Sequence, residues 1–118
     1  MSVAAVEESI RQHGARYLER VFTPRELADC GGDAQRLAAR FAAKEATLKV
    51  LRPTQGVSWL SIEVIRDPAG WVGLELGGVA AKLAEQAGIV GLALSLTHEG
   101  EYAAAVVVAE IESGDTRG

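Results

Sequence analysis

The chain has 118 residues and a formal net charge of −4, with 48% hydrophobic and 24% charged residues. These values are typical of one soluble globular domain. Nucleic-acid binding is disfavoured, because the chain is acidic and has no cluster of Lys and Arg. No apolar run reaches the roughly 18 residues that span a bilayer. We therefore expect neither nucleic acid nor a membrane as a partner.

The N-terminal residues contain Glu7, Glu8 and Arg11 and no apolar segment of the kind that a signal peptide needs. The single cysteine, Cys30, excludes an internal disulfide. Both observations predict a cytoplasmic protein.

Charge is unevenly divided along the chain. Residues 1–52 hold nine Lys and Arg against seven Asp and Glu, whereas residues 53–118 hold three against nine. The basic half could face an acidic protein or a phosphorylated ligand. The alternative is that its charges are ordinary solvated helix surface.

Three helices are predicted in the first half. Apolar residues at helical spacing predict the first over residues 3–20, with Ser2 as a possible N-cap. Thr23-Pro24-Arg25-Glu26 is a strong start signal for a short second helix that ends at Gly31-Gly32. The third is expected over residues 34–51, capped by Asp33 and ended before Pro53.

The second half changes to the alternating pattern of strands, with one further helix over residues 79–87. Strands are predicted over residues 59–64, 72–76, 92–98 and 102–111. Helices and strands are segregated, so we expect an α+β fold with helices packed on a small antiparallel sheet. We expect one domain over residues 1–112 and a flexible tail over 113–118.

The segment Arg40–Lys49 concentrates charge on the predicted third helix. At about 100° per residue, Arg40 and Glu45 lie about 140° apart around the helix axis. One interpretation is an amphipathic helix with a Glu45–Lys49 ion pair worth about 0.3–0.5 kcal/mol. The other is that Glu45 holds a hard cation while the basic residues hold phosphates. Spacing alone does not separate the two.

The chain resembles the holo-acyl-carrier-protein synthase family, the small single-domain type of 4'-phosphopantetheinyl transferase. The resemblance runs in order over about residues 10–110 without large insertions. The segments that carry it are Arg16–Glu26, Arg40–Glu45 followed by Lys49, Trp59 with Ile62-Glu63-Val64 and the Gly70 turn, and Leu94–Glu99 followed by Tyr102-Ala103.

The resemblance implies a reaction and a set of partners. 4'-Phosphopantetheine would pass from coenzyme A to a serine of an acyl or peptidyl carrier protein, releasing 3',5'-ADP, with Mg²⁺ as cofactor. Members typically form homotrimers whose active sites are shared between neighbours. The fold would be that of the 4'-phosphopantetheinyl transferases.

The resemblance also implies residue roles. Glu45 would bind Mg²⁺ and, with Lys49, act in catalysis. Coenzyme A would contact Arg40, Lys44, Lys49, Thr97 and His98, where Thr97 stands in place of a frequent serine. Arg16 would face the acidic carrier. The residues alone favour a turn histidine for His98 and a solvated helix residue for Arg16.

The chain departs from the family pattern at its start. Members begin with a strand carrying Gly-x-Asp, whose Asp is the second metal-binding carboxylate, and no Asp precedes Asp29 here. Either Met1 lies downstream of the true start, or Glu7 or Glu8 substitutes, or the protein binds carrier or coenzyme A without transfer. A more distant alternative is an unrelated oligomeric interaction module.

Overall fold

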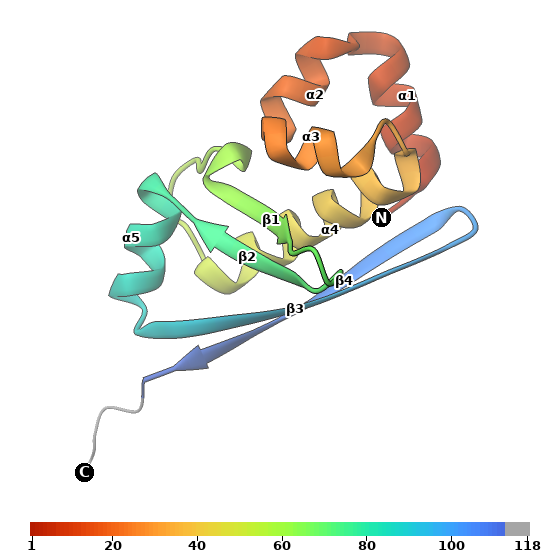
Figure 1. The fold of residues 1–118 in the computed structure, drawn as a ribbon. Helices are drawn as coiled ribbons and strands as arrows, with labels where there is room; N and C mark the ends of the chain where they lie inside the picture. The colour runs from red at the N-terminus through yellow and green to blue at the C-terminus, as the bar shows by residue number, and fades with distance from the viewer. Residues whose placement is uncertain (113–118) are drawn as a thin grey trace.

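The structure is a computed structural model that describes residues 1–112, so the predicted tail over 113–118 lies outside the described residues. The elements are α1 (Val3–His13), α2 (Ala15–Val21), α3 (Pro24–Cys30), α4 (Ala34–Leu51), η1 (Trp59–Ser61), β1 (Ile62–Arg66), β2 (Val72–Leu76), α5 (Gly78–Gln86), β3 (Ile89–Glu99) and β4 (Tyr102–Ile111). Figure 1 shows the helices α1–α3 gathered at one end of α4 and the long β3–β4 hairpin running along its side. The predicted α+β class is confirmed.

The first predicted helix is two helices, which corrects the prediction of one helix over residues 3–20. Gly14 ends α1 and begins α2, with φ 54° and ψ −132°. That conformation is open to glycine and costly for residues with a Cβ, so the chain turns there. Ser2 does cap α1, because its Oγ accepts a hydrogen bond from the Ala5 N–H.

We expect Gly14→Ala to lower the free energy of unfolding by about 1–3 kcal/mol, because alanine is strained at this backbone position. Urea denaturation followed by circular dichroism measures the change. Gly56→Ala is the matched control, since Gly56 has no positive φ and open space where a Cβ would lie. Equal stability of the two variants would show that the turn at Gly14 needs no glycine.

The predicted signals for α3 and α4 are confirmed. Thr23 and Glu26 form the capping box at the start of α3. The Asp33 carboxylate accepts hydrogen bonds from the first turn of α4, and the helix ends at Leu51, just before Arg52 and Pro53.

Two antiparallel hairpins form the β part. In the first, Ile62 pairs with Leu76 and Arg66 with Val72; in the second, β3 pairs along most of its length with β4. The strand expected over residues 59–64 begins only at Ile62. Ser58 accepts a hydrogen bond from the Leu60 N–H, so residues 59–61 form a short 3-10 helix instead.

A short extended segment before α1 lies along the beginning of β4. Met1 and Ala103 exchange two backbone hydrogen bonds of 2.9 Å each, and the Val3 N–H donates to the Glu101 carbonyl at 2.9 Å. The start of the described chain is therefore held by residues close to the end of the fold.

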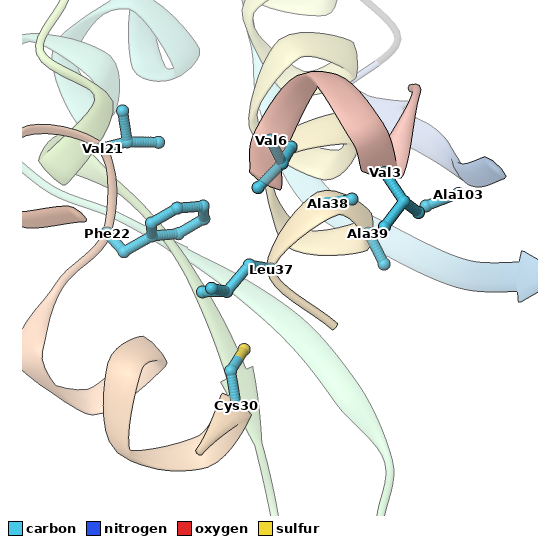
Figure 2. Packing of buried hydrophobic residues seen from close by; sticks show 9 residues of the cluster. All are labelled: Val3, Val6, Val21, Phe22, Cys30, Leu37, Ala38, Ala39 and Ala103. Atoms are coloured by element: carbon cyan, nitrogen blue, oxygen red, sulfur yellow. The ribbon is translucent and has the colours of Figure 1, made fainter. Parts of the chain in front are cut away.

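The larger core cluster lies between α4 and the short helices. Figure 2 shows Phe22 and Leu37 at its centre, with Val3 against Ala103 at one side. A second cluster lies beneath α5, where Leu51, Ile62, Ala80 and Ala84 are buried together. Helix α4 contributes residues to both clusters, and most of its polar side chains lie on its remaining faces. Among residues 1–112, no helix is both long and apolar enough to cross a membrane.

Candidate active site

A hollow lined by basic side chains lies where α4, the β1–β2 hairpin and β3 meet; we call it the cationic hollow. Its volume is about 220 Å³, and its lining residues are Arg36, Ala39, Arg40, Arg66, Val72, Leu96 and His98. None of these residues is acidic. Two predicted coenzyme A contacts that are distant in sequence, Arg40 and His98, therefore share one hollow.

Local structure explains how these side chains converge. Arg36 and Arg40 are one turn apart on α4 and so lie on the same side of the helix. Arg66 ends β1 directly opposite Val72. Leu96 and His98 lie on one face of β3 because side chains alternate along a strand.

Arg40 is the most enclosed of the basic groups, with only 5% of its surface exposed. One Nη donates to the Arg36 carbonyl at 3.5 Å, and among the described residues the buried Nε has no hydrogen-bond partner. A buried guanidinium with a free donor is suited to an anion such as phosphate.

Glu45 and Lys49 lie on a different side of α4 from Arg40, as the helical spacing requires. Glu45 is half-buried and Lys49 is exposed. Burial, followed by the negative charge of Glu45, raises the pKa of Tyr17 on α2. No ion pair joins Glu45 to Lys49 within residues 1–112. The Glu45–Lys49 ion pair of the first interpretation is therefore not formed, and Lys49 does not neutralise the Glu45 carboxylate.

Lys44 requires a correction. Its side chain is wholly buried, and its Nζ forms a 2.7 Å ion pair with Glu26 Oε1. The same Nζ donates to the carbonyls of Trp59 at 2.9 Å and Ile62 at 2.7 Å. Burial lowers the pKa of Lys44, and Glu26 opposes that shift. Because all three ammonium donors are used inside the protein, Lys44 is not placed to contact coenzyme A, contrary to the prediction.

Arg16 lies in a second basic hollow of about 310 Å³, on the surface of α1 and α2, with His13, Tyr17 and Arg20. Thr97 is exposed on the face of β3 opposite to His98, so the structure does not bring these two predicted contacts together within one chain. His98 itself is exposed and lines the cationic hollow.

The predicted substitutes for the missing aspartate are not grouped with Glu45. The Glu8 carboxylate accepts from Arg11 and Gln12 on the exposed side of α1. Glu7 lines a separate hollow beside Asp33 and Glu101. Within residues 1–112, no cluster of three or more His, Cys, Asp or Glu side chains forms a metal centre.

Sequence reasoning missed several lining residues. Arg36 and Arg20 were detectable, because each is four residues from a predicted site arginine on the same helix. Arg66 gives no such signal, because only the packing of the hairpin against α4 brings it to Arg40.

Comparison with known proteins identifies the family. The family model described as the 4'-phosphopantetheinyl transferase superfamily matches residues 1–107. The chain belongs to this superfamily. It is 40% identical over 115 residues to the holo-[acyl-carrier-protein] synthase of Geotalea daltonii, covering 93% of this chain and 92% of the relative.

Two further comparisons find proteins with the same name. The holo-[acyl-carrier-protein] synthase of Anaeromyxobacter dehalogenans strain 2CP-C is 47% identical over 98 residues, covering 80% of this chain and 76% of its own. The Helicobacter pylori holo-[acyl-carrier-protein] synthase, solved in complex with coenzyme A, superposes with a TM-score of 0.83 at 28% identity over 93% of this chain and 95% of its own. The protein is therefore an enzyme of the phosphopantetheinyl transferase class.

Proposed function

We propose that this transferase moves 4'-phosphopantetheine from coenzyme A to a serine of an acyl or peptidyl carrier protein and releases 3',5'-ADP. The observation that carries the proposal is the cationic hollow, in which Arg40 and His98 converge with two further arginines. A hollow lined by basic side chains suits a ligand with several phosphate oxygens.

In the proposed reaction the carrier serine Oγ forms a bond to the pantetheine-side phosphorus of the pyrophosphate, and its hydroxyl proton passes to solvent water. The bond from that phosphorus to the bridging oxygen breaks, and 3',5'-ADP leaves with the bonding electrons. The arginines of the cationic hollow hold the nucleotide phosphates and so fix the position of the leaving group. Lys49, exposed one turn after Glu45, neutralises negative charge on the transferred group.

Glu45 fits a magnesium ligand. The residue is half-buried, and its carboxylate makes no ion pair within residues 1–112. Mg²⁺ in phosphoryl-transfer sites is commonly held by only one or two carboxylates together with substrate phosphates. When bound, the ion neutralises charge on the pyrophosphate. Glu45 is the residue of this chain that would hold it.

We further propose that the protein is a homotrimer with shared sites. Arg40 and Glu45 lie on different sides of α4, so a neighbouring subunit is needed to bring one chain's Glu45 to another chain's cationic hollow. The outer face of the β3–β4 hairpin supports this, because Val106 and Val108 are 61% and 60% exposed there. Such an apolar face suits contact between subunits.

The carrier is proposed to dock at the basic hollow of α1 and α2. Arg16 and Arg20 are exposed and one helical turn apart, which presents two positive charges to an acidic carrier. This assignment extends the predicted role of Arg16 to its neighbour.

Transfer is tested by incubating apo-carrier protein with coenzyme A and Mg²⁺ and weighing the carrier by mass spectrometry. Addition of the phosphopantetheine mass to at least one carrier is expected. If coenzyme A binds but no carrier gains mass, the protein is a binding-only homologue and the proposed transfer is wrong.

Arg40→Gln is expected to weaken binding of 3',5'-ADP by about 10- to 100-fold, because hydrogen bonds to charged groups contribute about 1.5–3 kcal/mol. Isothermal titration calorimetry gives the dissociation constants. Arg25→Gln removes the same charge from an exposed position on α3 outside the hollow and serves as control. Equal loss in both variants would indicate only a general charge effect.

Val106→Glu is expected to convert the trimer to monomer, because a carboxylate would be buried without a partner in the subunit contact. Sedimentation velocity measures the mass. Val79→Glu, at a 42% exposed position on α5, should remain trimeric. A wild-type protein that sediments as a monomer would contradict the proposed assembly.

A further inference from the structure

The Glu26–Lys44 pair is the one fully buried ion pair of residues 1–112, and the proposed reaction does not use it. Both side chains are 0% exposed, so neither can touch a substrate. Glu26 lies on α3 and Lys44 on α4, and their polar atoms also contact η1 and β1. The pair therefore connects several parts of the fold that are distant in sequence.

Its hydrogen bonds determine how β1 is placed on α4. Lys44 Nζ donates to the Trp59 and Ile62 carbonyls at 2.9 and 2.7 Å. Glu26 Oε2 accepts from the Val64 N–H at 2.7 Å, and Oε1 accepts from the Thr23 N–H at 2.8 Å. A slip of β1 along α4 would break at least two of these bonds inside the core, where unmet polar groups are costly.

Stability alone gives no strong reason for such a pair. Replacing both members of a buried ion pair with uncharged side chains of similar volume is often neutral or stabilising, whereas their geometry can specify one arrangement of the packed elements. The pair therefore affects function through any site residue whose position depends on β1.

Arg66 is such a residue. It is the last residue of β1, two positions beyond Val64, and its exposed side chain lines the cationic hollow opposite the α4 residues Arg36 and Arg40. The arginines of the hollow thus come from two walls, α4 and the β1–β2 hairpin, while β3 supplies Leu96 and His98. The position of β1 on α4 sets the spacing between the arginines of the two walls.

We propose that Glu26 and Lys44 are positioning residues for the nucleotide phosphates, acting by holding β1, and therefore Arg66, at a fixed distance from Arg36 and Arg40. This inference rests on the proposed function of the cationic hollow. It assigns Lys44 an indirect role in coenzyme A binding in place of the direct contact predicted from the sequence.

The test uses the full chain with Glu26→Gln and Lys44→Met combined, which removes both charges and nearly preserves volume. The expected result is a rise of about tenfold in KM for coenzyme A and in Kd for 3',5'-ADP, with KM for the carrier within twofold of wild type. Thr47→Val is the control, since Thr47 is equally buried on α4 but bonds only within its own helix, to Ala43. It should leave both KM values unchanged.

A double-mutant cycle with Arg66→Gln separates positioning from general loosening. If the pair acts through Arg66, the double substitution should add less than twofold to Kd for 3',5'-ADP once Arg66 is already Gln. Full additivity would overturn the proposal. Arg66 is exposed, so Arg66→Gln should fold even if the core variant does not. An unchanged Kd in Arg66→Gln alone would also overturn it.

The outcomes distinguish this inference from the proposed function. Absence of transfer and of 3',5'-ADP binding in wild type would refute the function of the hollow. Normal binding in wild type, with the same Kd in the core variant, would refute only the positioning role.

Discussion

Glu45→Gln is expected to reduce phosphopantetheine transfer at least 100-fold while the protein remains folded. The substitution keeps the size of the side chain but removes the negative charge that would hold Mg²⁺. Even losses of groups around a metal's ligands typically cost 10- to 100-fold, so loss of a direct ligand should cost at least that much. Initial rates of carrier modification at saturating coenzyme A measure the effect.

Without metal, the same variant should bind 3',5'-ADP as tightly as wild type, because in the proposed site the arginines of the cationic hollow hold the nucleotide phosphates and Glu45 holds only the metal. Glu85→Gln, at an exposed position on α5, is the control and should retain full transfer. A Glu45→Gln variant that transfers at the wild-type rate would exclude Glu45 as the metal ligand.

Lys44→Met is expected to lower the free energy of unfolding by about 3–5 kcal/mol, because it leaves the Glu26 carboxylate charged, buried and without its partner. Urea denaturation at neutral pH measures the loss. Adding Glu26→Gln should recover a large part of it, since no buried carboxylate is then left without its cation.

The control for this prediction is Lys49→Met, which makes the same substitution on the exposed side of α4. It should change stability by no more than about 0.5 kcal/mol. If Lys44→Met and Lys49→Met were equally stable, the ammonium of Lys44 would not contribute to the core as the structure indicates.

The sequence predicted helix ends correctly where they depend only on neighbouring residues. The Thr23 capping box, the Asp33 cap and the stop before Pro53 depend on neighbouring residues only, and all three agree with the structure. The apolar, β-branched run from Tyr102 to Ile111 likewise gave β4 its bounds. The break at Gly14 was missed because helical periodicity continues through it while the backbone does not.

The candidate site was predictable only in part, for a different reason. A helical wheel shows which residues share a side of α4, but not which side faces the core. The family resemblance grouped Lys44 with the substrate contacts, and nothing in the spacing showed that it points inward to Glu26. Arg66 reaches the cationic hollow only through tertiary packing. Family resemblance supplied Arg40 and His98, and the structure places both in the lining of one hollow.

The pairing of Met1 with Ala103 has a consequence for how the chain is made. The segment that leads into α1 finds its backbone partners only in residues 101–103, and Val3 packs in the same cluster as Ala103. On the ribosome, α1 can form and pack on α4 early, but the segment before it cannot complete its backbone pairing until residues 101–103 have emerged. Since contacts between distant parts of a chain form slowly, the last strand completes the packing of the first helix.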